Sequence, residues 1–265
     1  FFMGESAKVL NPNKTILLPD VNADCAMAHM ADVATIQKMR EQYDDLAVVC
    51  YINSTIELKQ HSDVCVTSSN AVKIVKALPN KNIFFIPDRN LARYVAAQVP
   101  EKNFVFNEGY CPIHEAIFIS EVKELQELYP NALILAHPEC KQELLEMADY
   151  IGSTAGIIEF ATQSNAKEFI ICTENGIRYE LERKNPDKKF YFTKTEPVCP
   201  DMKMVTLEKI RDVLKEGSND VQVTDQQLIE ESKKGLNTLE LFTKIIELYR
   251  LIVTKSKNYT VFLLQ

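Results

Sequence analysis

The sequence lacks the features that mark several large classes of protein. Basic residues are not in excess, since 30 Lys and Arg stand against 37 Asp and Glu and give a net charge of −7. This charge argues against general nucleic-acid binding, which needs a basic face, but does not exclude a small anionic substrate. Nowhere does an apolar run approach the roughly 20 residues of a membrane helix. We therefore expect a globular protein without a nucleic-acid or membrane partner.

The ends and the cysteines also lack the features of a secreted protein. The first residues, Phe1-Phe2-Met3-Gly4, have neither the basic start nor the sustained apolar stretch of a signal peptide. The cysteine count is seven, an odd number, so the cysteines do not suggest a disulfide framework. These features favour a reducing compartment and predict a cytoplasmic protein whose cysteines are core residues or metal ligands.

What the sequence does contain is an internal repeat. Cys25 lies 86 residues before Cys111, and Cys199 lies 88 residues after it. Shifting the chain on itself by 86 residues aligns other side chains as well. The aligned pairs are Tyr43 with Tyr129, Tyr51 with His137, Asn53 with Glu139, Asp63 with Asp149, Ser68 with Thr154 and Asp88 with Glu174. A repeat of this kind sets the architecture of the whole chain.

Each repeat unit alternates apolar strands with helical stretches, which predicts parallel sheets covered by helices on both faces. We expect an α/β fold of three pseudo-symmetric, three-layer αβα units around a pseudo-threefold axis. The first unit is incomplete, with Cys25 as its cysteine and Glu5 as the counterpart of Asp88; its other parts are expected upstream of residue 1. The expected boundaries are residues 1–44 for this remnant, 45–130 and 131–215 for the second and third units, and 216–265 for a C-terminal helical region with an unassigned tail.

Individual elements follow from the local patterns of apolar residues. Strands are predicted at residues 15–18, 47–50, 64–66, 83–86, 103–106, 133–136, 169–172 and 190–193. Helices are predicted at residues 5–12, 35–42, 54–61, 71–78, 157–162, 206–214 and 226–249. In the helix at 206–214, the spacing of Leu207, Ile210 and Leu214 predicts the buried face. Residues 254–265 match nothing in the repeat.

Polar residues follow the strands at corresponding positions of the two complete units. Tyr51 and Asn53 end one strand, and His137 and Glu139 end its counterpart. The carboxyl ends of parallel strands line the ligand crevice of such sheets. The Ser/Thr positions of the repeat, typified by Ser68, open helices whose N–H groups can bind anions. The simpler interpretation is that these residues only cap their helices, but recurrence beside polar strand ends favours binding.

Cys25, Cys111 and Cys199 have three interpretations. Structural zinc needs four ligands, usually in C-x2–4-C pairs; none of the three belongs to such a pair, so a fourth ligand would have to come from His29, His114 or another cysteine. An iron–sulfur cluster with three cysteine ligands keeps one iron open as a Lewis acid. The third interpretation is buried core cysteines. It suits Cys50, Cys65, Cys140 and Cys172, which lie in or beside apolar strands, better than the three that share a repeat register.

The motifs of the chain closely resemble those of the quinolinate synthase family over about residues 1–215. The segments that carry the resemblance are Leu18-Pro19-Asp20, Cys25-Ala26-Met27-Ala28, Tyr51-Ile52-Asn53, Ser62 to Ala71, Gly109 to Glu115, His137-Pro138-Glu139-Cys140, Gly152-Ser153-Thr154 and Cys199 to Lys203. The resemblance implies a [4Fe–4S] cluster held by Cys25, Cys111 and Cys199, with one iron open to substrate. It also implies condensation of iminoaspartate with dihydroxyacetone phosphate to quinolinate in NAD biosynthesis, and a functional link to an enzyme that produces iminoaspartate.

The resemblance also implies roles for individual residues. Tyr51 and Asn53 would contact substrate, with Tyr51 a candidate for proton transfer. Ser68 and Thr154 would hold carboxylates or phosphate, with Ser69 and Ser153 as neighbours. His137 would bind a carboxylate and could carry a positive charge there. Glu139 would be the general base, with a pKa raised toward the working pH by anions and the cluster. The alternative function is a non-catalytic iron–sulfur or metal-binding remnant of the same family.

Overall fold

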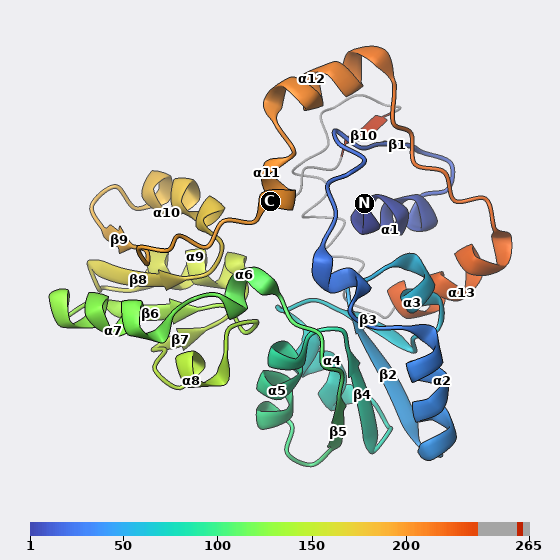
Figure 1. Cartoon of the computed structure of the whole chain (residues 1–265), viewed down its shortest axis with the longest axis horizontal. Helices are drawn as coiled ribbons and strands as arrows, with labels where there is room; N and C mark the ends of the chain where they lie inside the picture. The colour runs from blue at the N-terminus through green and yellow to red at the C-terminus, as the bar shows by residue number, and fades with distance from the viewer. Residues whose placement is uncertain (238–258, 262–265) are drawn as a thin grey trace.

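The fold is built on two parallel four-stranded sheets, with α1 (Phe2–Leu10) and β1 (Thr15–Leu17) beyond them (Figure 1). The computed structural model describes residues 1–237 and 259–261. The first sheet has the order β3-β2-β4-β5 and the second the order β7-β6-β8-β9, so the two sheets have the same topology. The strands of the first sheet are β2 (Leu46–Tyr51), β3 (Val64–Val66), β4 (Asn82–Ile86) and β5 (Asn103–Phe106). Those of the second are β6 (Leu133–Ala136), β7 (Tyr150–Ile151), β8 (Glu168–Cys172) and β9 (Lys189–Tyr191). The α/β class and the parallel sheets are as predicted.

Helices cover both faces of each sheet, which is why the strands read as continuous apolar runs. Ile134 and Ala136 pack into one cluster with residues of α7 and α8, whereas Leu135, between them, packs with residues of α9 and α10 on the other face. The helices beside the second sheet are α7 (Ile119–Leu128), α8 (Gln142–Leu145), α9 (Thr154–Gln163) and α10 (Arg178–Lys184), with the short 3-10 helix η2 (Asn175–Ile177). Those beside the first sheet are α2 (Val33–Gln42), α3 (Ile56–Gln60), α4 (Ala71–Ala77) and α5 (Arg89–Gln98).

Matching hydrogen bonds in the two sheets confirm the repeat. The Asp63 carboxylate accepts a hydrogen bond from the backbone N–H of Val48 at 2.7 Å. In the second sheet, the Asp149 carboxylate accepts one from the N–H of Ile134 at 2.8 Å. Both the donors and the acceptors are 86 residues apart, so the sequence repeat is a repeat of three-dimensional contacts. The predicted strands agree with the observed ones to within two residues at each end.

The first unit contributes α1 (Phe2–Leu10) and β1 (Thr15–Leu17), and β1 pairs in parallel with β10 (Tyr259–Val261). The predicted equivalence of Glu5 with Asp88 is wrong. Asp88 precedes α5 and caps it, whereas Glu5 lies within the first turn of α1. The helix therefore begins closer to residue 1 than the repeat suggested. The pseudo-threefold axis and the unit boundaries stay predictions.

The three cysteines predicted as ligands each precede a short helix. Cys25 is the N-cap residue of the 3-10 helix η1 (Ala26–His29), Cys111 that of α6 (Pro112–Glu115) and Cys199 that of α11 (Pro200–Lys203). All three cysteines have extended backbone angles. Figure 1 shows these short helices around the middle of the molecule, between the two sheets and the first unit. The repeat thus delivers one cysteine from each unit to the central region.

Two longer helices complete the described chain: α12 (Leu207–Glu216) and α13 (Gln226–Leu236). The predicted buried face of α12 is wrong: Leu207 is 80% exposed and Leu214 40%, while Val213 is the buried residue of this helix. Apolar spacing marks a face that can pack, but α12 lies at the outer edge of the described molecule (Figure 1).

The predicted helix at 226–249 is observed as α13 up to Leu236, and its remainder from residue 238 lies outside the described residues, as does most of 254–265. Helix α13 packs on α3, where the Ser232 hydroxyl donates to the carbonyl of Ile56 at 3.3 Å. Among the described helices, none is long and apolar enough to cross a membrane.

Candidate active site

The predicted site residues lie at the carboxyl edges of the two sheets. Tyr51, the last residue of β2, pairs with Val66 of β3, so Asn53 and Ser68 each follow two residues beyond this pair. In the second sheet Ala136 pairs with Ile151. His137, Glu139 and Thr154 come directly after this second pair. Because the strands are parallel, their carboxyl ends form one edge of each sheet, where ligand sites of α/β proteins are found.

Glu139 is the centre of a buried polar cluster. Its Oε2 lies 2.8 Å from His114 Nδ1 and 3.8 Å from His137 Nδ1. The same His114 nitrogen lies 3.2 Å from Cys111 Sγ. The two imidazole rings stack with their centres 4.7 Å apart. A carboxylate, two imidazoles and a thiol therefore share one site. The site is closed to water around His114 and Glu139, whose exposed fractions are 7% or less.

Tyr51 joins this cluster as a proton donor. Burial raises the pKa of the Tyr51 hydroxyl well above 10, and the charge of Glu139 and a hydrogen bond to it act in the same direction. A phenol with a raised pKa stays protonated at neutral pH. Tyr51 therefore presents an O–H group to the Glu139 carboxylate, which fits the predicted role in proton transfer.

His137 is neutral in this site, contrary to the expected cation. Burial lowers the pKa of its imidazole from 6.5 to about 4, although the charge of Glu139 acts to raise it. The backbone N–H of Glu139 donates to His137 Nδ1 at 3.3 Å. Nδ1 therefore accepts and the proton of the neutral ring is on Nε2. The expectation failed because the ring is 5% exposed, and sequence position alone did not show that depth.

The protein surroundings of Glu139 lower the pKa of its carboxyl, and the rise expected from bound anions and a cluster stays a prediction. Burial does raise the pKa of this carboxyl, but the imidazoles of His137 and His114 and hydrogen bonds from His114 and Tyr51 outweigh burial and lower it. His114 is the nearer of the two imidazoles, with its Nδ1 2.8 Å from the carboxylate. Glu139 is therefore ionised at neutral pH and able to accept a proton.

The three cysteines predicted as metal ligands are free thiols, each partly exposed, whereas the other four are buried and also free. Burial raises the pKa of Cys25 to about 12, and the charges of Glu139 and Cys199 act in the same direction. Burial likewise raises the pKa of Cys111, with Glu139 and Cys25 adding to the rise. Cys25 and Cys111 therefore lie in one electrostatic neighbourhood beside Glu139. A bound metal ion reverses such shifts, because it holds a coordinating thiol deprotonated.

Ser68 and Thr154 are not needed for helix capping. The N-cap residue of α4 is Asn70, and that of α9 is Ser153, whose hydroxyl accepts from the N–H of Gly156 at 3.2 Å. Ser68 lies two residues before its cap, and Thr154 is the first residue of its helix. The simple capping interpretation therefore applies to Ser153 but not to the two residues predicted to bind anions.

Sequence reasoning missed three residues of the cluster as site residues. His114 was considered only as a fourth zinc ligand; its position three residues after Cys111 places both in one helical turn. Thr173, directly after β8, lies with its hydroxyl 2.9 Å from His114 Nε2, and no sequence pattern indicated this contact. Asp88 was identified as a repeated strand-end acid. Its carboxylate accepts from the N–H of Cys111 at 3.0 Å, and the Glu174 carboxylate accepts from the N–H of Cys199 at 3.1 Å.

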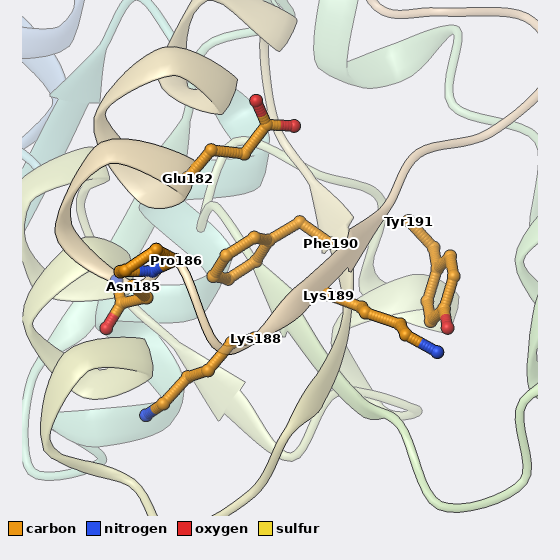
Figure 2. A pocket seen from close by; sticks show the side chains of 7 residues that line it. All are labelled: Glu182, Asn185, Pro186, Lys188, Lys189, Phe190 and Tyr191. Atoms are coloured by element: carbon orange, nitrogen blue, oxygen red, sulfur yellow. The ribbon is translucent and has the colours of Figure 1, made fainter.

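A surface pocket of about 370 Å³ lies apart from this cluster, beside β9 (Figure 2). None of the predicted site residues lines it. Figure 2 shows Lys188 and Asn185 in its wall, but the Lys188 ammonium already donates to the carbonyls of Ala161 and Ser164 at the end of α9. The Asn185 amide is similarly bonded to Thr162 and Leu181. These two polar groups of the pocket therefore stabilise the fold. The buried cluster around Glu139 is the better candidate site.

The fold and the cluster define an α/β enzyme with acid–base groups and a thiol at the carboxyl ends of parallel strands. Comparison with known families agrees with this class. Residues 1–239 match the model of a family described as quinolinate synthetase A protein. The chain belongs to this family and is an enzyme of the quinolinate synthase type.

Several curated relatives are similar over most of the chain, and each is called quinolinate synthase. One from Fusobacterium nucleatum is 53% identical over 248 residues, which cover 94% of this chain and 80% of the relative. One from Clostridioides difficile is 50% identical, covering 93% of this chain and 80% of the relative. One from Caldicellulosiruptor bescii is 46% identical, covering 90% and 78%.

Proposed function

We propose that this chain condenses iminoaspartate with dihydroxyacetone phosphate, releasing phosphate and two water molecules, to give quinolinate for NAD biosynthesis. The observation that carries this proposal is the buried pair of an ionised Glu139 and a protonated Tyr51 beside Cys111. The names of the relatives supply the product. A separate enzyme that produces iminoaspartate would provide one substrate, in a cytoplasmic setting.

The donor set of the three central cysteines fits a [4Fe–4S] cluster. Cys25, Cys111 and Cys199 each begin a short helix in the central region and are free thiols. Iron–sulfur clusters are held by such thiolates, and three ligands for four irons leave one iron open. When bound, the cluster supplies a Lewis acid at that open iron. Asp88 and Glu174 hold the backbone N–H groups of Cys111 and Cys199, which fixes the directions of these two ligands.

Glu139 and Tyr51 supply the acid–base chemistry. The Glu139 carboxylate takes a proton from a substrate carbon during isomerisation and dehydration, and the Tyr51 hydroxyl gives one to a departing or developing oxygen. Glu139 and Tyr51 start in opposite protonation states, as a base and an acid must. His114 stabilises the carboxylate by its 2.8 Å contact and so keeps it ionised.

The remaining predicted residues bind the anionic groups of the substrates. His137 is neutral with its proton on Nε2. It therefore binds a substrate carboxylate by donating a hydrogen bond and not by forming an ion pair. Ser68 and Thr154 donate from their hydroxyls, and Asn53 from its amide, at the edges of the two sheets. A neutral donor set of this kind binds a carboxylate without holding product too tightly for release.

Replacing Glu139 tests this assignment. Glu139→Gln keeps the shape but cannot accept a proton, so quinolinate formation should fall by about 10²–10⁴-fold. The absorption of the bound cluster should stay unchanged, because Glu139 is not one of its proposed ligands. Glu143→Gln, at an exposed position of α8, is the matched control and should leave both unchanged. Full activity of Glu139→Gln would remove this residue from the mechanism, and a loaded wild-type protein without activity would favour a non-catalytic cluster-binding function.

A further inference from the structure

The buried cluster offers a set of metal-ligand atoms that differs from the three cysteines. We propose that Cys111, His114 and Glu139 bind a single thiophilic divalent cation of the zinc class. Among the residues that the structure describes, these three form the group whose ligand atoms (one sulfur, one nitrogen and one oxygen) all lie within 4.8 Å of one another. This site does not depend on the proposed reaction, because it is defined by geometry and donor chemistry alone.

The distances between the ligand atoms are close to those that zinc requires. His114 Nδ1 lies 2.8 Å from Glu139 Oε2 and 3.2 Å from Cys111 Sγ. In a tetrahedral zinc site with ordinary bond lengths, these separations are about 3.4 Å and about 3.6 Å. His114 Nδ1 therefore needs to move away from the other two ligand atoms by roughly half an ångström, which side-chain rotation can supply. The third pair, Cys111 Sγ and the Glu139 carboxylate, lies within 4.8 Å.

Hydrogen bonds from the surrounding structure hold the three ligands in place. Thr173 Oγ1 lies 2.9 Å from His114 Nε2. When a metal ion displaces the proton that His114 Nδ1 shares with Glu139, Nε2 donates to this hydroxyl and Nδ1 is left as the ligand atom. The backbone N–H of Cys111 donates to Asp88 at 3.0 Å. The Asn90 amide donates to the backbone carbonyl of Glu139 at 3.1 Å. Partners of this kind orient metal ligands and fix the tautomer of a ligating histidine.

The donor set selects the kind of cation. A thiolate with an imidazole suits zinc and its neighbours and disfavours magnesium or calcium, which prefer oxygen ligands. Three protein ligands leave a fourth position for water, as in zinc sites that are open to solvent. Cys111 is the partly exposed member of the group, so this position faces the side from which an ion can enter.

Zinc at this site and a cluster at the three cysteines exclude each other. Both use the Cys111 thiolate as a terminal ligand, and we take this sulfur to bind one metal at a time. Zinc-loaded protein should therefore take up less iron and sulfide during anaerobic reconstitution, and removal of zinc by a chelator should restore the uptake. The site thus makes cluster assembly sensitive to zinc.

The test is a titration of metal-depleted protein with zinc, read by competition with a chromophoric chelator. Wild type should bind one zinc ion at this site. His114→Gln and Glu139→Gln should each weaken binding at least tenfold. Thr173→Val should weaken it about 10–100-fold by releasing the histidine, and Thr173→Ser, which keeps the hydroxyl, should restore it. Cys199→Ser is the matched control, since it should lose the cluster but keep the zinc affinity of wild type.

Cobalt substitution gives a readout that does not depend on the folding of any variant. Co²⁺ bound by a thiolate shows a sulfur-to-metal charge-transfer absorption, which wild type should develop with one equivalent of Co²⁺. No such band would overturn the proposal. So would zinc binding that is unchanged in His114→Gln and Glu139→Gln, or that is lost in Cys199→Ser. A protein that assembles the cluster but binds no zinc would leave the proposed function standing, so the two failures are distinguishable.

Discussion

His114 and His137 determine how the carboxylate between them behaves. Glu139 would be expected to protonate readily at its depth, yet its pKa is lowered by the imidazoles of His137 and His114 and by hydrogen bonds from His114 and Tyr51. His137, equally buried, stays neutral. One imidazole thus stabilises the base and the other supplies a neutral donor. The sequence predicted both His137 and Glu139 as site residues, but their protonation states depend on contacts from other parts of the chain.

The Tyr51 hydroxyl is expected to act as a proton donor. Tyr51→Phe removes this O–H group and little volume, so quinolinate formation should fall by about 100-fold or more while cluster absorption is retained. Because the pKa of Tyr51 is raised well above 10, wild-type activity should show no alkaline loss that follows its ionisation below pH 10. Tyr179→Phe, at an exposed position, is the control. Equal activity of Tyr51→Phe and wild type would assign the proton to another group.

The buried neutral His137 should make stability depend on pH. The unfolded chain takes up a proton near pH 6.5, but folded His137 does so only near pH 4. The free energy of unfolding should therefore fall as pH decreases from about 7 to about 4, by up to about 3 kcal/mol from this ring. Above pH 6.5 the contribution is fully present.

Denaturant unfolding at several pH values measures this effect. His137→Gln should flatten the dependence between pH 4 and pH 6.5, although it lowers stability overall. His61→Gln, at a partly exposed position, should keep the wild-type slope. A wild-type slope in His137→Gln would mean that another group titrates.

At the scale of elements, short helices that begin at a cysteine are the units that build the central site. Asp88 caps α5 through the N–H of Leu91 at 2.7 Å and also holds the N–H of Cys111. One side chain therefore joins the start of α5 to Cys111, which is a proposed ligand of the cluster. The Glu174 carboxylate similarly accepts from Gly176 at the start of η2 and from Cys199. The repeat made both acids visible in the sequence, because they occupy the same register.

Removal of the Asp88 carboxylate should affect both the start of α5 and the position of Cys111. Asp88→Ala should destabilise the fold by about 1–2 kcal/mol through the lost cap, and should lower iron uptake. Burial raises the pKa of Asp88 well above its ordinary value, with the charge of Glu139 adding to the rise. Asp88→Asn keeps one of the two acceptor oxygens, so it should lie between the Ala variant and wild type in thermal unfolding and iron uptake. An Asn variant as damaged as the Ala variant would show that both acceptor oxygens are essential.

The strands were easier to predict than the packing of the helices. Buried parallel strands such as β4 and β8 are short apolar runs bounded by polar residues, so their positions follow from composition. The exposed Leu207 and Leu214 of α12 show the limit, because an apolar stripe on a helix does not reveal whether a partner surface faces it. Thr173 shows a second limit: its contact with His114 spans 59 residues and has no local pattern.

At the scale of the whole molecule, the repeat explains how distant residues reach one site. The two sheets have equal strand order, and the residues at their carboxyl edges include Tyr51 from one and His137 with Glu139 from the other. Residues 88 positions apart in sequence thereby meet in one buried cluster beside Cys111. The first unit, with Cys25 after β1, supplies the third thiol, and no sheet partner of β1 could be predicted from the repeat.

The most direct test of this account is the iron and acid-labile sulfide content per chain after anaerobic reconstitution. We expect about four of each in wild type, lost in Cys25→Ser, Cys111→Ser and Cys199→Ser but retained in Cys65→Ala, which changes a buried core cysteine. This result would mean that the three units bring their cysteines to one point. A folded wild-type chain that takes up no iron, or a Cys111→Ser variant that takes up as much as wild type, would contradict the account.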